Sequence, residues 1–169
     1  MENQLDVEKR HAAVCGLYCG ACALFIATAE DPERLKQLAA KLQLAVEEAK
    51  CHGCRSDKKS NFCESCKFCA CAAERGIEFC SHCFEYPCAE LTAFQAERPH
   101  RMDLWNDLAR VKAIGYEKWL GEIRNRYTCP RCQTINSAYD LKCRKCGNSP
   151  SCDYVAEHGP AVERFLLNR

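Results

Sequence analysis

Cysteine pairs separated by two residues carry the clearest chemical signal in this sequence. Two such pairs lie near the C-terminus, Cys129 with Cys132 and Cys143 with Cys146, and ten residues separate them. Two intervening residues let a tight turn aim both sulfurs at one metal ion, with metal–sulfur bonds of roughly 2.3 Å. Two pairs joined by a spacer of hairpin length are typical of a zinc ribbon. Because four thiolates leave no open coordination position, we predict a structural zinc site rather than a catalytic one.

A denser group of cysteines occupies residues 51–88. These 38 residues contain nine of them: Cys51, Cys54, Cys63, Cys66, Cys69, Cys71, Cys80, Cys83 and Cys88. Large apolar side chains are scarce in this stretch, so burial alone would not offset the entropy lost on ordering it. We predict that thiolate–metal bonds hold the stretch together in two closed sites near one another. Cys71 and Cys88 would complete the C-x-x-C pairs, and the pairing itself is left open.

A third group, Cys15, Cys19 and Cys22, has the spacing by which cluster-binding radical enzymes hold an iron–sulfur cube through three of its irons. The resemblance to those enzymes ends at the spacing, because the chain is too short for their barrel. The spacing still permits a four-iron, four-sulfur cluster with one open position. We favour a separate zinc site that a remote cysteine closes, and we keep the cluster as the alternative cofactor.

The number of cysteines limits how these groups combine. Of the 17 cysteines, four belong to the ribbon, and twelve of the remaining thirteen would fill three four-thiolate sites. The spare is then Cys152, which lies outside the dense stretch, or Cys69, which shares a short segment with Cys71. If both are spare, eleven remain, enough for two closed sites and an N-terminal site with three thiolates.

The remaining composition predicts a small protein of the cytoplasm. The 169 residues suit one ordinary domain with a small added module. The first residues lack the basic flank and apolar run of a signal peptide, and no apolar run is long enough to span a membrane. In a reducing cytoplasm, paired cysteines are more often metal ligands than disulfides. The net charge of +1 gives no overall field that would attract nucleic acid or a membrane.

Basic residues nevertheless surround the predicted ribbon. They are Lys118, Arg124, Arg126, Arg131, Lys142, Arg144 and Lys145. Such a surface could touch phosphate groups, but only Tyr127 and Tyr139 are available to stack on bases. We therefore interpret the basic residues as a solvated surface and keep nucleic acid as a less favoured partner.

Hydrophobic spacing and capping residues predict a mainly α-helical chain. We expect a buried helix after Cys22, an amphipathic helix over 32–49 with Asp31 as its N-cap, and a short helix over 70–75 that Gly76 ends. Further helices are expected at 87–96, after Asp103 up to Gly115, at 116–126 and at 160–167, with turns and short strands over 128–148. The fold class is thus a mainly α, metal-stabilised, cysteine-rich domain over 11–126 and a small β zinc ribbon over 127–148. A tail with a short helix over 149–169 completes it.

The cysteine segments together form a more specific pattern than any one of them. They are Cys15-Gly16-Leu17-Tyr18-Cys19-Gly20-Ala21-Cys22, Cys51-His52-Gly53-Cys54, and the run from Cys66 and Cys71 through Cys80-Ser81-His82-Cys83 to Tyr86-Pro87-Cys88. Over roughly residues 13–120 this pattern resembles a cysteine-rich domain of unknown function from bacteria and archaea, in which several members append a zinc ribbon. The resemblance implies metal binding and a soluble cytosolic protein without an assigned reaction. It also aligns Cys71, and not Cys69, with the family's cysteine between Cys66 and Cys80.

Three functions follow from these patterns, in order of preference. The first is a cytoplasmic multi-site zinc protein whose sites are structural and whose surface binds a protein partner. The second is an iron–sulfur enzyme or sulfur-handling protein with an open cluster at Cys15, Cys19 and Cys22. The third is a nucleic-acid module centred on the ribbon. Because no catalytic triad or phosphate-binding glycine loop is present, we assign no catalytic residue and leave enzymatic activity open.

Overall fold

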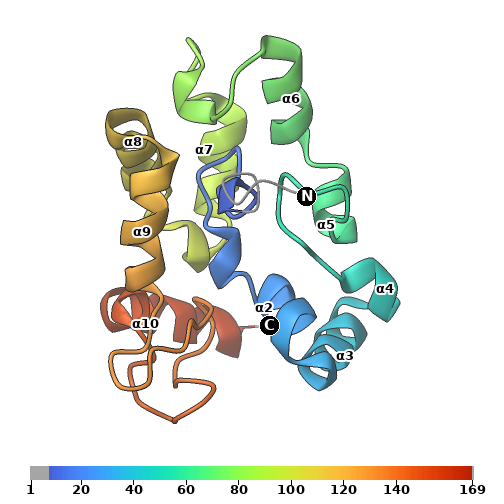
Figure 1. Cartoon of the computed structure of the whole chain (residues 1–169), viewed down its shortest axis with the longest axis vertical. Helices are drawn as coiled ribbons and strands as arrows, with labels where there is room; N and C mark the ends of the chain where they lie inside the picture. The colour runs from blue at the N-terminus through green and yellow to red at the C-terminus, as the bar shows by residue number, and fades with distance from the viewer. Residues whose placement is uncertain (1–7, 169) are drawn as a thin grey trace.

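Helices surround the N-terminal segment in a computed structural model that describes residues 8–168 (Figure 1). The first residues, on which the expectation of no signal peptide rests, lie outside this range. The main helices are α2 (Ala23–Glu30), α3 (Pro32–Leu42), α4 (Val46–Ala49), α5 (Asn61–Glu64), α6 (Lys67–Arg75), α7 (Ala89–Ala96), α8 (Leu104–Ile114), α9 (Tyr116–Arg126) and α10 (Asp153–Leu167). Three 3-10 turns accompany them: η1 (Cys19–Ala21), η2 (Cys80–His82) and η3 (Pro99–Arg101). The predicted mainly helical, cysteine-rich fold is confirmed.

The apolar core lies where the N-terminal segment meets α6, α7, α8 and α9. Its most buried large side chains include Phe79, Leu91, Leu104, Leu108 and Trp119, each at most 1% exposed. A smaller apolar cluster joins α2, α3 and α4. The stretch 51–88 therefore contributes Phe68 and Phe79 to the core that it shares with these helices, so thiolates are not its sole support.

The predicted β-structure of the ribbon is wrong, because residues 8–168 contain no strand or sheet. One isolated antiparallel bridge joins Thr128 to Ile135. Backbone bonds close both cysteine turns of the ribbon: Cys129 donates to Thr134 O at 2.8 Å, and Cys143 donates to Asn148 O at 2.8 Å. The Cys129 bond is one of the two that form this bridge, and the pairing does not extend beyond it, so no strand forms.

The predicted helix over 32–49 is divided in two. Asp31 caps its start as expected, since Asp31 Oδ1 accepts from Arg34 N at 3.0 Å. However, Gln43 takes a left-handed conformation with φ 56°, and Leu44 N donates to Ala39 O at 3.0 Å. This bond closes the end of α3, as in many helix C-termini.

The C-terminal helix is longer than predicted. It begins at Asp153 instead of Pro160, and Pro160 lies inside it. Proline removes one backbone hydrogen bond of a helix, but the fully buried Tyr154 and Val162 fix the segments on both sides. The expected helices after Cys22 and at 116–126 are confirmed, as are those that end at Gly76 and Gly115. No helix within residues 8–168 combines the length and the apolar character that crossing a membrane requires.

Candidate metal centres

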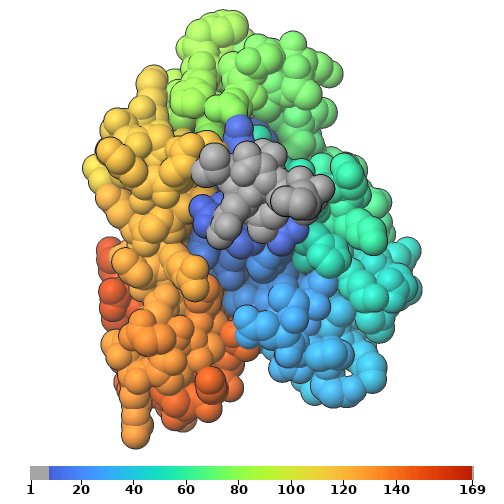
Figure 2. Space-filling view, viewed as in Figure 1, coloured from blue at the N-terminus to red at the C-terminus, as the bar shows by residue number. Residues whose placement is uncertain are grey.

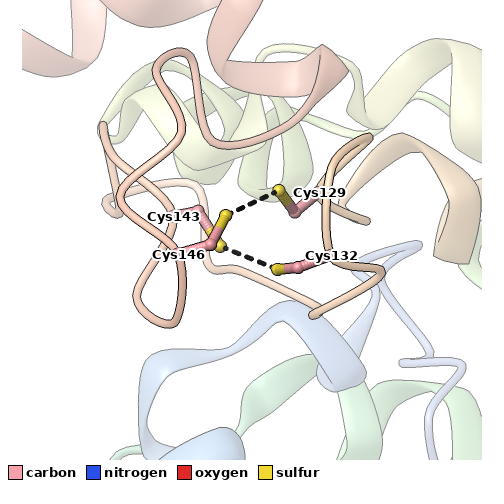
Figure 3. A group of neighbouring side chains, drawn as sticks. All are labelled: Cys129, Cys132, Cys143 and Cys146. Atoms are coloured by element: carbon pink, nitrogen blue, oxygen red, sulfur yellow. Dashed lines mark hydrogen bonds between the residues drawn. The ribbon is translucent and has the colours of Figure 1, made fainter.

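The four ribbon cysteines converge on one point, as the sequence predicted. Cys129 and Cys132 from one turn face Cys143 and Cys146 from the next (Figure 3). The sulfurs of Cys129 and Cys146 are 3.7 Å apart, and those of Cys132 and Cys143 are 3.5 Å apart. All four lie within 4.8 Å of one another, so this cluster could hold a metal ion.

The turns of the ribbon aim hydrogen-bond donors at these sulfurs. Burial raises the pKa of Cys143, but the backbone N–H groups of Cys146 and Lys145 outweigh it and lower the pKa to about 6. The hydroxyl and the N–H of Thr134 lower the pKa of Cys132 in the same way. Metal ions bind the thiolate and not the thiol, so these donors prepare the site for a metal.

A buried polar residue supports the ribbon from behind. Asn136 is fully buried, and its Nδ2 donates to Thr134 O at 3.0 Å and approaches Cys143 Sγ at 3.7 Å. Its Oδ1 accepts from Arg144 N at 3.0 Å. Hydrogen bonds of this kind around metal ligands fix the orientation of the ligands.

Cys54, Cys66 and Cys69 form a second group of sulfurs. The sulfurs of Cys54 and Cys69 are 3.4 Å apart. A hydrogen bond from Cys69 lowers the pKa of Cys54 to about 6 and that of Cys66 to about 5, while the two thiolates raise the pKa of Cys69. Cys15 is 7% exposed, and its pKa is raised by burial and then by Cys54, Cys80 and Cys66. Cys69 was left unassigned by the sequence, although Cys66-x-x-Cys69 is itself a C-x-x-C pair.

A third group joins the N-terminal motif to the dense stretch. Burial and the thiolates of Cys51 and Cys22 raise the pKa of Cys63 to about 12. Burial and the thiolate of Cys54 raise the pKa of Cys19, whose sulfur also accepts the N–H of Cys54. Cys19 and Cys22 thus lie near cysteines of the dense stretch, and the separate site of Cys15, Cys19 and Cys22 stays a prediction.

Two C-x-x-C pairs are divided between these groups. Cys63 lies on α5 and Cys66 directly precedes α6, so the two belong to different helices. Between Cys51 and Cys54, Gly53 has a φ of 105°, and a Cβ on it would lie 2.5 Å from the carbonyl oxygen of Arg10. Only glycine fits this turn without strain.

The last four cysteines of the stretch surround one pocket. Cys71, Cys80, Cys83 and Cys88 line it together with apolar side chains of α6 and α7. Cys152 is not part of the cysteine groups described above; it is 1% exposed and directly precedes α10. Its sulfur lies 3.6 Å from Ser151 Oγ.

An acidic group outside the cysteines holds an arginine. Asp103, Glu157 and His158 offer atoms that lie within 4.8 Å of one another. The guanidinium of Arg126 binds Asp103 and lies 2.8 Å from Glu157 Oε2, while His158 Nε2 lies 2.8 Å from Asp103 Oδ1. The guanidinium of Arg126 therefore neutralises this acidic group, and the side chain of Asp103, which precedes α8, is engaged in the ion pairs and not in a cap of that helix. The sequence had shown no partner for His158.

Ion pairs also use part of the basic surface around the ribbon. Arg144 Nη2 lies 2.6 Å from Glu30 Oε2, and Arg34 Nη2 lies 2.7 Å from Asp140 Oδ1. These pairs join the ribbon to α2 and α3, which lie beside it in the space-filling view (Figure 2). The tyrosine rings of Tyr127 and Tyr154 stack at 4.9 Å and join the ribbon to α10.

Comparison with known proteins agrees with the resemblance seen in the sequence. The model of a family described as "Protein of unknown function (DUF3795)" matches residues 11–93. This match contains the cysteines from Cys15 to Cys88 and ends before the ribbon. No curated protein and no solved structure matches the chain. The predicted recognition is therefore confirmed for a cysteine-rich domain of unknown function.

Proposed function

We propose that this chain is a cytoplasmic multi-site zinc protein whose metal sites are structural and whose surface binds a protein partner. The observation that carries the proposal is the convergence of the four ribbon sulfurs within 4.8 Å. A single tetrahedral ion with bonds of roughly 2.3 Å separates its sulfurs by about 3.8 Å. The separations of 3.5 and 3.7 Å in the ribbon fit this value.

Zinc suits the ribbon better than an iron–sulfur cube. A cube places each thiolate on a different iron, so its sulfurs lie farther apart than those around one ion. A tetrahedral set of four thiolates is typical of zinc or of iron, and zinc is the usual ion of closed structural sites. Four ligands leave no position for substrate, which supports a structural role.

The open-cluster alternative has less support. It requires Cys15, Cys19 and Cys22 to face one cluster. The charges that act on Cys15 come from Cys54, Cys80 and Cys66, and the charge of Cys54 acts on Cys19 more strongly than that of Cys22. A nucleic-acid role is also weakened, because Arg126 and Arg144 are engaged with carboxylates. All 17 cysteines are unpaired by disulfides, which supports the cytoplasm as the location.

Metal analysis of anaerobically purified protein tests the proposal. We expect several equivalents of zinc, without acid-labile sulfide. Cys132→Ser should lose one equivalent, whereas Cys152→Ser is the matched control and should keep the full content. Protein without metal, or iron and sulfide in place of zinc, would contradict the proposal.

A further inference from the structure

The pocket between α6, η2 and the start of α7 contains four cysteines from three separate elements. Cys71 lies on α6, Cys80 opens η2, Cys83 follows η2, and Cys88 precedes α7. We propose that Cys71, Cys80, Cys83 and Cys88 together form one four-thiolate metal centre. This inference rests on the proposed function and names the ligands of one of its sites.

The four sulfurs are close enough to act on one another. Burial and then the charges of Cys88, Cys71, Cys66 and Cys83 raise the pKa of Cys80, which directly follows the buried Phe79. Thiolates that share one pocket repel each other, and a bound cation removes this repulsion. The four positions therefore suit a metal ion better than four separate thiols.

A guanidinium lies at the rim of the same pocket. Arg75, the last residue of α6, places Nη1 at 3.4 Å from Cys83 Sγ and also hydrogen-bonds with Cys71. Its Nη2 lies 2.6 Å from Glu85 Oε2, which orients the group. Four thiolates around a divalent ion carry a net negative charge, so an arginine that donates to them stabilises the centre.

The frame of the pocket is held by the protein itself. Cys80 N donates to Val14 O at 2.9 Å, and Cys83 N donates to Cys80 O at 3.1 Å. Phe79 and Leu91 are each 1% exposed and anchor the segments next to the ligands. The core thus positions these cysteines before a metal binds.

The pocket sulfurs lie farther apart than those of the ribbon. In residues 8–168 the ribbon is the one group of three or more cysteines whose sulfurs all lie within 4.8 Å. A single zinc ion would require these four sulfurs to move closer together, whereas a cluster of iron would span a wider set. Zinc and iron both bind thiolates. Metal analysis of a Cys→Ser variant shows which of the two is lost, and so identifies the metal of this centre.

Paired substitutions test whether the four cysteines share a centre. In the full-length protein, Cys83→Ser and Cys88→Ser should each lose the metal of one centre, and the double variant should lose that same single centre. Cys83→Ser combined with Cys132→Ser should lose two centres, and Cys152→Ser should lose none. Full metal content in both single variants, or loss of two centres in C83S/C88S, would overturn the assignment. If C132S also keeps its metal, the proposed function fails as well.

A measurement on the unaltered protein tests the same assignment without any variant that could fail to fold. Metal is withdrawn stepwise with a chelator, and exposed thiols are alkylated and located by mass spectrometry. Cys71, Cys80, Cys83 and Cys88 should become reactive in one step, separately from the ribbon. Reaction of the four in different steps would refute a shared centre.

A second assignment follows from an independent contact, the 3.4 Å separation of Cys54 Sγ and Cys69 Sγ. We infer that Cys69 is a metal ligand together with Cys54, Cys66 and the buried Cys15. Cys69 and Cys71 are two positions apart on α6, and residues with this spacing do not lie on the same face of a helix. Cys69 therefore faces Cys54 from one side of α6, and Cys71 lines the pocket from another side.

Helix α6 offers the matching test. Cys69→Ser should lose one centre, and C54S/C69S should lose the same one. C69S/C71S should lose two, although the residues are near neighbours in sequence. Full metal content in C69S, or loss of a single centre in C69S/C71S, would overturn this assignment.

Discussion

The ribbon and the cysteine-rich helical region use the same ligand in different ways. All four ribbon sulfurs come from residues 129–146, and the polar Asn136, Ser137 and Ser151 are buried behind them beside the apolar Ala138 and Tyr154. In residues 11–93 the cysteines lie mostly at the ends of helices, against an apolar core that includes Phe79 and Leu91. The comparison indicates that a bound metal would be the main support of the ribbon. In the helical region, a metal would add to the support that the apolar core already gives.

Loss of the metal from the ribbon should have the largest effect, and it tests the contrast between the two regions. Cys129 is fully buried in the ribbon. Metal binding contributes roughly 10–16 kcal/mol in small zinc domains, which matches or exceeds the whole stability of a typical domain, about 5–15 kcal/mol. Cys129→Ser should therefore make residues 128–151 sensitive to protease while most of the helical circular dichroism remains. Unchanged protease resistance, or loss of all helicity, would contradict the contrast, and C152S is the control.

A pH experiment sharpens the comparison from the helical side. Trp119 Nε1 donates to Asp107 Oδ1 at 3.2 Å, and burial raises the pKa of Asp107 to about 7. The folded state then binds a proton more tightly than the unfolded state, so this carboxyl favours folding below about pH 4. That contribution declines as the pH rises to about 7, by roughly 2–4 kcal/mol.

Asp107→Asn removes this titration and keeps an acceptor for Trp119. Relative to the unaltered protein, the variant should gain stability between about pH 4 and 7 and show a constant difference above that range. Urea unfolding of both proteins at each pH measures the difference in their free energies of unfolding. Metal release at acid pH affects both proteins alike and cancels in this difference. A difference that does not change with pH would show that Asp107 ionises normally.

The polar interior of the ribbon gives a smaller effect. Asn136→Ala leaves the N–H of Arg144 and the carbonyl of Thr134 without their partner. Unpaired buried groups cost about 1–3 kcal/mol each, so we expect a loss of this size in urea unfolding and a weaker hold on the ribbon metal. The exposed Asn125 on α9 provides the control, because N125A should change stability by less than about 0.5 kcal/mol. Equal effects of the two variants would mean that the ribbon does not depend on its polar interior.

The ion pairs between the two regions should matter least. Glu30 is 56% exposed where it meets Arg144, so Glu30→Gln should cost less than about 1 kcal/mol, and less still at high salt. The pair of Arg34 and Asp140 is 20% and 14% exposed, and D140N should cost more than E30Q. Thermal unfolding at low and high salt tests both. A larger loss in E30Q than in D140N would contradict this ranking by burial.

Predictions from the sequence succeeded where a few neighbouring residues decide the structure. Asp31 with Pro32 started α3, Gly76 and Gly115 ended helices, and the ribbon pairs brought their sulfurs together. The continuous helix over 32–49 was wrong because the apolar spacing does not reveal the left-handed turn at Gln43. Ribbon strands were wrong because backbone pairing in the ribbon stops at the isolated bridge of Thr128 and Ile135. The zinc identity, the domain division and the protein partner remain predictions.

The sequence by itself determined that the chain is helical, rich in metal-type cysteine pairs and equipped with a ribbon, since capping and C-x-x-C turns depend on local geometry. Only the tertiary structure decided which distant thiols meet. Cys63 lies on α5 and Cys66 precedes α6, and Cys69 and Cys71 lie on different faces of α6. The physical reason is that a thiol at a helix end is directed by the packing of the helix, and that packing depends on apolar contacts between segments far apart in the chain.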